Sequence, residues 1–185
     1  MNSYPDKLTA RVFFALWPNE AERRALAAWQ TALPGGGRAM RPDTLHVTLV
    51  FLGEVATDRL EALKLAAEEV SAPRFDVSFD QARYWGHNHI LYAASGAVPQ
   101  QLAQLVHDLK GNLKRHRFAF DQREYQPHVT LLRNARWRDE ALPGMLPVRW
   151  DIRGFVLLQS VQRNNEVKYR VLARFPLGDV LPFPG

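Results

Sequence analysis

Two copies of one tetrapeptide carry the side chains in this sequence that are best suited to acid–base chemistry. The sequence His-Val-Thr-Leu occurs at His46–Leu49 and again at His128–Leu131. Each copy lies in an apolar run, and alternate side chains of an extended strand point to opposite faces. The histidine and threonine of each copy are therefore expected on one face, with the valine and leucine on the other. Two histidines beside one substrate can act as general base and general acid near neutral pH.

Hydrophobic periodicity and turn residues predict the elements that hold the first copy. An apolar strand is expected at 11–17, followed by a helix that begins after Asn19 and ends before the turn residues at 34–37. A second helix is expected to have Thr57 as its cap and to end before Pro73. The apolar faces of these helices are predicted to contain Ala21, Ala25, Trp29 and Leu33 in the first, and Leu60, Leu63, Ala67 and Val70 in the second.

The second part of the chain repeats this layout. Strands are expected at 75–85 and 90–94, joined by a tight turn, and a helix at about 99–114 leads to the second copy. The apolar face of this helix is predicted to contain Leu102, Leu105, Val106, Leu109 and Leu113. Two closing strands are expected at 151–161 and 167–175. We therefore predict two similar fused units whose histidine strands face each other across a pseudo-two-fold cleft.

Length and composition limit the class of protein. A chain of 185 residues suits one domain, which we expect to span 1–185 as two intertwined lobes. The absence of cysteine excludes disulfides and thiolate metal sites. A polar N-terminus at 1–7 and the lack of an apolar segment of membrane-spanning length favour a cytoplasmic protein with no membrane partner. The net charge of +5 favours an anionic partner such as nucleic acid.

The two copies and their flanks resemble the paired signatures of the 2H phosphoesterase superfamily. Within it, the chain is most similar to the LigT-like (ThpR-type) RNA 2′,3′-cyclic phosphodiesterases. The segments that carry the resemblance are 11–16, 45–53, 127–133, 158–160 and Tyr169. One departure is Tyr125-Gln126, where relatives often carry Phe and His. The resemblance implies an α+β fold of two duplicated β-α-β units, with largely antiparallel sheets facing a central cleft.

The resemblance also implies a reaction, in which water opens the cyclic phosphate at an RNA 3′ end and leaves a 2′-phosphate. It implies that His128 is the proton acceptor that activates water and that His46 is the proton donor at the departing ribose 3′-oxygen. Thr48 and Thr130 are expected to donate hydrogen bonds to the non-bridging phosphate oxygens, on which negative charge builds in the transition state.

Arginine and aromatic side chains are expected to bind the rest of the substrate. The planar donors of Arg133 suit the phosphate charge, although strict strand alternation places Arg133 on the face opposite His128. Tyr125 lies close to the second copy and is expected to stack on a base. Further arginines that could line the approach of the RNA backbone are Arg11, Arg41 and Arg170.

No metal or cofactor is expected. His87 and His89 lie two residues apart, but no carboxylate cluster accompanies them, and no phosphate-binding glycine loop is present. The expected partner is an RNA with a 2′,3′-cyclic phosphate end, or a small cyclic nucleotide, bound by a monomer. Two alternatives stay open: a non-catalytic module that binds RNA ends, and ATP-independent 2′-5′ RNA ligation as a side or reverse activity.

Overall fold

The computed structural model of the chain describes residues 7–138 and 141–178. Within these ranges the strands form three antiparallel sheets. The first sheet contains, in spatial order, β10 (Glu166–Pro176), β9 (Gly154–Arg163), β1 (Thr9–Leu16) and β3 (Val47–Ala56). The second contains β2 (Arg38–Ala39), β7 (Val129–Arg133), β6 (Ile90–Ala94) and β5 (Gln81–Trp85). The third pairs β4 (Phe75–Phe79) with β8 (Val148–Ile152).

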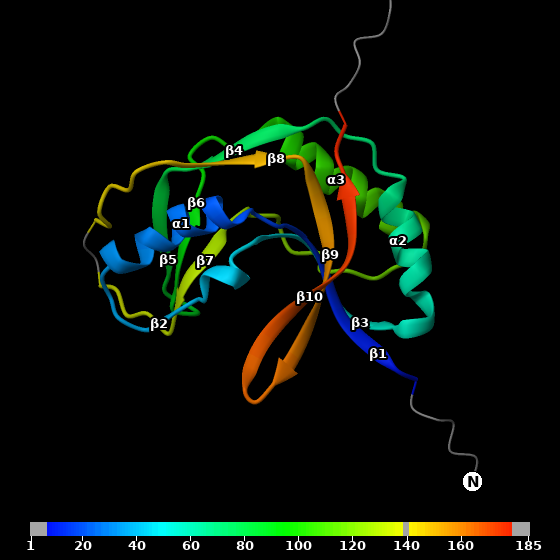
Figure 1. The fold of residues 1–185 in the computed structure, drawn as a ribbon, viewed down its shortest axis with the longest axis horizontal. Coiled ribbons are helices and arrows are strands. Elements are labelled where there is room, and N and C mark those ends of the chain that lie inside the picture. Colours follow the sequence, from blue (N-terminus) through cyan, green and yellow to red (C-terminus); the bar gives the residue numbers. More distant parts are fainter. Residues whose placement is uncertain (1–6, 139–140, 179–185) are drawn as a thin grey trace, which may run out of the picture.

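The helices cross between the two parts of the chain. The described helices are α1 (Glu20–Ala32), α2 (Leu60–Glu68) and α3 (Gln100–Arg115), with 3₁₀ turns η1 (Pro42–Thr44) and η2 (Thr57–Arg59). Helix α1 follows β1 of the first sheet but contacts β7 of the second, whereas α3 precedes β7 but contacts β3. Figure 1 shows α2 and α3 together at one end of the molecule and α1 at the other. Antiparallel sheets with these helices confirm the α+β fold.

Helix α1 begins where the sequence predicts but buries a different face. The Asn19 side chain accepts a hydrogen bond from the Glu22 amide, and the Glu22 carboxylate accepts one from the Asn19 amide. This capping box satisfies two amides that the first turn leaves unpaired. The predicted face was partly wrong, because Ala21 and Ala25 are exposed. The buried face contains Leu26, Trp29 and Leu33, the large apolar side chains of the segment.

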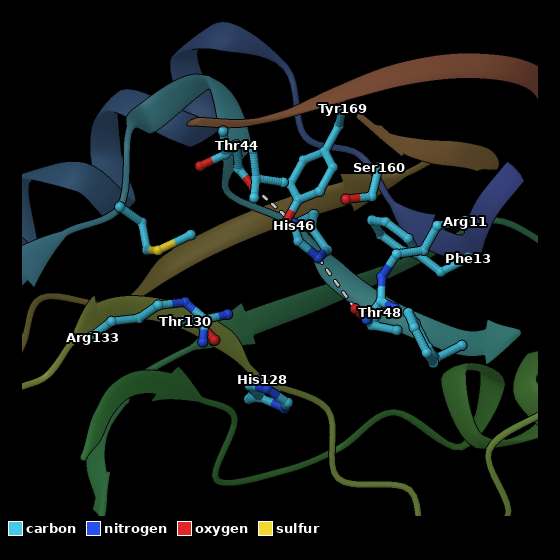
Figure 2. A pocket seen from close by; sticks show the side chains of 13 residues that line it. Arg11, Phe13, Thr44, His46, Thr48, His128, Thr130, Arg133, Ser160 and Tyr169 are labelled. Atoms are coloured by element: carbon cyan, nitrogen blue, oxygen red, sulfur yellow. Dashed lines mark hydrogen bonds between the residues drawn. The ribbon is translucent and has the colours of Figure 1, made fainter. Parts of the chain in front are cut away.

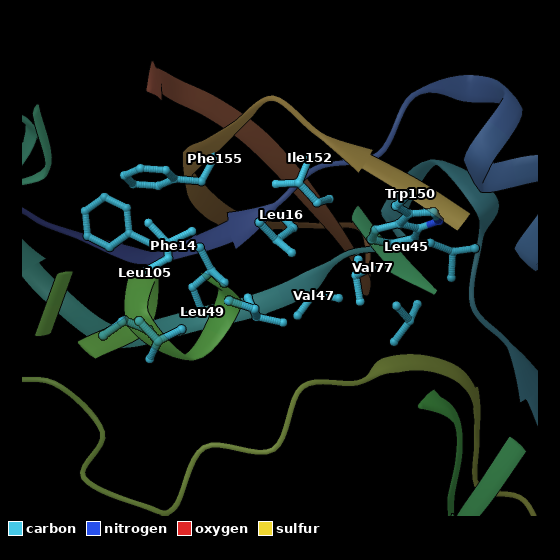
Figure 3. Close-up of a cluster of buried hydrophobic side chains, with 14 of the residues drawn as sticks. Phe14, Leu16, Leu45, Val47, Leu49, Val77, Leu105, Trp150, Ile152 and Phe155 are labelled. Carbon is cyan, nitrogen blue, oxygen red and sulfur yellow. The ribbon is translucent and has the colours of Figure 1, made fainter. Parts of the chain in front are cut away.

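One hydrophobic core joins the two four-stranded sheets, which contain the motif strands β3 and β7. It includes Val47 and Leu49 of the first motif and Val129 and Leu131 of the second, which confirms the predicted apolar faces of the two motif strands. Figure 3 shows Val47 and Leu49 beside Phe14 and Leu16 of β1, with Leu105 of α3 close by. All five residues predicted for the apolar face of α3 are buried. The description of the chain as one domain of two intertwined lobes stays a prediction.

Each motif strand contains a β-bulge directly after its threonine. In β3, Thr48 pairs with Ala15 and Val50 pairs with Phe14, so Leu49 has no partner residue on β1. In β7, Thr130 pairs with Tyr92 and Leu132 pairs with Leu91, so Leu131 has no partner on β6. A bulge inserts one extra residue and resets the alternation of side chains beyond it. Two consecutive apolar residues in each strand are therefore buried.

Three predicted boundaries were wrong. The run 75–85 is not one strand, because it divides at Asp80 into β4 and β5 of different sheets. At this break the Asp80 amide bonds the Ala94 carbonyl, and its carboxylate accepts from the Gly96 amide. The predicted strand 151–161 likewise contains the end of β8 and most of β9. Thr57 begins a 3₁₀ turn instead of capping α2 through its side chain.

The packing of α3 against the sheet gives a prediction for stability. Leu105→Ala should lower the free energy of unfolding by about 2–5 kcal/mol, because it removes buried methyl groups and leaves a cavity in the core. The matched control is Gln101→Ala on the exposed side of the same helix, which should change it by less than about 0.5 kcal/mol. Urea unfolding followed by circular dichroism measures both. Equal effects would contradict the assignment of the buried face.

Candidate active site

A cavity of about 320 Å³ lies between the two motif strands. Both histidines and both threonines of the motifs line it, together with Arg133. Figure 2 shows His46 and Thr48 on one side of this cavity, with His128, Thr130 and Arg133 on the other. The structure therefore brings together five of the six residues for which the sequence predicts a direct role. The cavity is called the central pocket below.

The ring of His46 is oriented by hydrogen bonds on both nitrogens. Nδ1 lies 2.7 Å from the carbonyl oxygen of Thr44, and Nε2 lies 3.2 Å from the hydroxyl oxygen of Thr48. A carbonyl can only accept, so Nδ1 carries the proton and Nε2 of the neutral ring accepts from Thr48. Aromatic rings enclose the imidazole, with Phe13 and Tyr169 both at centroid distances of 5.1 Å.

The ring of His128 is held in the equivalent way. Its Nδ1 lies 2.8 Å from the carbonyl oxygen of Gln126, so it also donates to the residue two positions earlier. The rings of Trp85 and Tyr92 meet it edge to face, at centroid distances of 4.6 and 5.6 Å. In both histidines Nδ1 donates a hydrogen bond to a main-chain carbonyl oxygen. Nε2 is therefore the nitrogen of each ring that can exchange a proton with a bound molecule.

The pocket holds both imidazoles in the neutral form. Burial lowers the pKa of His46 from 6.5 to about 4, against the opposing effect of the hydrogen bond to Thr44. The charge that His128 carries when it is protonated and the charge of Arg133 act in the same direction as burial. Burial also lowers the pKa of His128, and the Arg133 charge acts in the same direction. An anion between the rings would favour their protonated forms, because opposite charges attract more strongly where water is excluded.

The bulges bring a third side chain of each motif segment into the pocket. Arg133 lines the pocket, which overturns the expectation from strict alternation, because the extra residue Leu131 resets the strand before it. Phe51 lies three residues after Thr48, as Arg133 lies three residues after Thr130, and it lines the pocket too. The two lobes therefore present an aromatic ring and a guanidinium at equivalent positions.

Tyr125 does not line the central pocket. Its ring packs against the main core and its hydroxyl is buried, and burial raises the pKa of this hydroxyl above its ordinary value. Closeness to His128 in sequence therefore does not bring the ring into the central pocket, and base stacking by Tyr125 stays a prediction. Arg11 does line the pocket, with its guanidinium 4.9 Å from the centre of the Phe51 ring. Arg170 does not line it.

Several pocket residues were not predicted as site residues. Phe13 comes from β1, and Ser160 and Tyr169 come from β9 and β10, far from both motifs in sequence. A signal was present for Tyr169 in the resemblance of the closing strands. No local pattern distinguishes Phe13, which is one of several aromatic residues in an apolar run.

The lining of the pocket is cationic and neutral. No aspartate or glutamate lines it among the residues that the structure describes. Over the same described ranges, no group of three or more histidine, cysteine, aspartate or glutamate side chains is arranged to hold a metal ion. Nor is any helix within residues 7–138 and 141–178 long and apolar enough to cross a membrane.

The chain belongs to the 2′-5′ RNA ligase superfamily, whose family model matches residues 17–164. An RNA 2′,3′-cyclic phosphodiesterase of Escherichia coli is 30% identical over 169 residues, which cover 90% of this chain and 96% of the relative. An RNA 2′,3′-cyclic phosphodiesterase of Thermus thermophilus is 28% identical over 180 residues, covering 90% of each chain. Among solved structures, E. coli LigT complexed with 3′-AMP superposes with a TM-score of 0.84 at 29% identity, covering 92% of this chain and 99% of LigT.

The enclosure of His46 predicts how stability depends on pH. In the unfolded chain its pKa is near 6.5, whereas in the folded chain it is about 4. Between these values the unfolded chain binds more protons, so stability is full above about pH 6.5 and falls as pH is lowered toward 4. His46 should account for a loss of about 3 kcal/mol over this window. Urea unfolding between pH 4 and 7.5 measures it.

The variant His46→Gln should flatten this part of the pH dependence, because the substituted side chain does not titrate. His107→Gln, on the exposed side of α3, should keep the wild-type dependence. An unchanged slope in His46→Gln would show that the His46 ring is not desolvated.

Proposed function

We propose that this chain hydrolyses RNA ends that carry a 2′,3′-cyclic phosphate and leaves a 2′-phosphate. The observation that carries the proposal is that two matched His-x-Thr segments and Arg133 converge on one pocket from pseudo-equivalent strands. The names of the relatives in Escherichia coli and Thermus thermophilus support the substrate class. The absence of carboxylates from the described lining of the pocket supports a reaction without a metal, since hard cations prefer oxygen ligands.

Proton transfer runs through the two Nε2 atoms. A water molecule attacks phosphorus while the bond between phosphorus and the ribose 3′-oxygen breaks. His128 accepts the proton that the water loses, and His46 donates a proton to the departing 3′-oxygen. The Nδ1 atoms, each donating to a main-chain carbonyl, keep both rings oriented throughout.

The threonines and Arg133 stabilise the charge on the phosphate. Thr48 donates to Nε2 of the neutral His46 in the unbound pocket. Once Nε2 is protonated it can no longer accept, which releases the Thr48 hydroxyl to donate to a non-bridging oxygen. Thr130 has the equivalent place beside His128, and the Arg133 guanidinium adds charge-assisted donors.

The bound substrate prepares His46 for its role as acid. In the unbound pocket the pKa of His46 is about 4, so the ring is mostly neutral at pH 7. The negative charge of the cyclic phosphate raises this pKa and also offsets the effect of Arg133 on the imidazoles. Binding of the cyclic phosphate therefore favours the protonated form of His46, which is the form that can act as the acid.

We further infer that the chain acts as a monomer in the cytoplasm. Side chains of a single chain line the pocket on both sides, which supports a site complete within one copy. The absence of cysteine fits a reducing compartment.

The decisive experiment is hydrolysis of an RNA oligonucleotide that ends in a 2′,3′-cyclic phosphate, in excess EDTA. Wild type should turn over and give a 2′-phosphate, whereas His46→Ala and His128→Ala should each lose about 10²- to 10⁴-fold in rate. The control variant His107→Ala removes an exposed histidine and should keep wild-type activity. Phosphorus NMR identifies the product isomer.

Each contrary outcome would indicate a different function or mechanism. Binding of the oligonucleotide without turnover would indicate a non-catalytic module that recognises RNA ends. Loss of activity in EDTA would indicate metal-dependent chemistry. Joining of ends in place of hydrolysis would reverse the roles of the two histidines.

The lowered pKa values predict the pH dependence of the rate. The profile of kcat/KM reports the unbound enzyme and should be a bell with its optimum below pH 6.5, because both histidines titrate below that value. The profile of kcat should be displaced to higher pH, because the bound phosphate favours the protonated imidazoles. Initial rates measured between pH 4 and 9 give both profiles. A flat kcat/KM across this range would exclude the two-histidine mechanism.

A further inference from the structure

A second cavity opens directly beside the central pocket. It has a volume of about 510 Å³ and lies between the segment of β2 and η1 and the end of the β9–β10 hairpin. Arg133 and Tyr169 line both cavities, so the two lie side by side. Arg38 and Arg41 line only the second cavity, which is called the side groove below.

Two arginines face each other along one wall of the side groove. Arg38 of β2 is the register partner of Arg133 of β7 in the antiparallel pair. Opposed residues of such a pair have Cβ atoms about 5 Å apart, and like charges placed there destabilise the sheet. Neither guanidinium has an ion-pair partner among the described residues. An anion bound between them would turn this repulsion into two charge-assisted interactions.

Arg41 has a different part in the groove. Its guanidinium lies 3.0 Å from an oxygen of Asp43 and 3.3 Å from an oxygen of Glu166, so two carboxylates balance its charge. The pair with Glu166 links η1 to the β9–β10 hairpin across the groove. The hairpin turns at Asn164 and Asn165, both with positive φ, as a two-residue turn of this kind requires. Arg41 therefore builds the wall, and the unbalanced positive charge belongs to Arg38 and Arg133.

We propose that the side groove binds the phosphodiester on the 5′ side of the terminal nucleotide. This inference rests on the proposed function, because it places the cyclic phosphate in the central pocket between the histidines. Arg133 lines both cavities and lies between the two phosphates, while Arg38 contacts only the second. The substrate is then an RNA chain or a 5′-phosphorylated nucleotide, in preference to a cyclic nucleoside phosphate with a free 5′-hydroxyl.

Three substrates test the proposal. They are a nucleoside 2′,3′-cyclic phosphate with a free 5′-hydroxyl, the same compound with a 5′-phosphate, and a dinucleotide with the same cyclic end. For wild type, kcat/KM should be about tenfold higher for the second and third than for the first, as one charged hydrogen-bonded contact provides. This advantage should decrease as salt is added.

Arg38→Gln should reduce the advantage to nearly one in both comparisons. The matched control is Arg163→Gln, which removes an exposed arginine at the end of β9 that does not line the groove, and it should keep the wild-type ratio. Thermal unfolding of both variants checks that each is folded. The ratio of two substrates in one variant is unaffected by the fraction of active enzyme.

Different results would contradict phosphate binding in the side groove and the proposed hydrolysis. Equal hydrolysis of all three substrates by wild type would contradict phosphate binding in the side groove but would agree with the proposed function. A preference for the dinucleotide that persists in Arg38→Gln would also overturn it, because the recognised group is then a base or ribose. Wild type that hydrolyses none of the three, nor the longer oligonucleotide, would refute the proposed function itself.

Discussion

The β-bulge that follows each His-x-Thr segment is the constraint on which the site depends. In a regular strand the third residue after the threonine points away from the threonine face, and at position 133 this would direct a guanidinium into the core. A buried cation without a partner is strongly unfavourable. The extra residue at Leu49 and at Leu131 gives each strand two successive core residues and returns the next side chain to the pocket. The pocket face and the core face of each strand are thus produced by the same irregularity.

The two motif strands have equivalent backbones, but the side chains around their histidines differ. The histidines share a hydrogen bond to the carbonyl two residues earlier, and both strands contain the bulge at the same place. The side chains around them differ, with Phe51 in one lobe where Arg133 stands in the other. His46 is the histidine whose pKa falls to about 4. The two imidazoles therefore differ in proton affinity although the backbones that hold them are equivalent.

Local sequence signals were sufficient to predict features that depend on a single helix or strand. The five large apolar residues of α3 recur at helical spacing and all are buried, and the Asn19 cap lies at the predicted residue. The face of α1 was less well predicted, because alanine counts as apolar in a pattern but has little area to bury. The pairing of the two histidine motifs was predictable because both copies carry the same residues in corresponding places.

The remaining features depend on residues far apart in sequence. The placement of Arg133 follows from the register of β7 with β6, which no property of the segment 127–133 specifies. The break at Asp80 depends on bonds to Ala94 and Gly96, and the position of Tyr125 depends on the core against which it packs. In each case the missing information was the identity of the spatial neighbour.

The exchange of helices between the lobes has a mechanical consequence. Because α1 packs on β7 and α3 packs on β3, the layers that carry the two histidines are fastened to each other twice through the interior. A hinge between the lobes would have to pull a helix out of an apolar contact at each end. Both packing contacts therefore oppose a change in the distance between the imidazoles, and a ligand has to fit the width that folding sets between them.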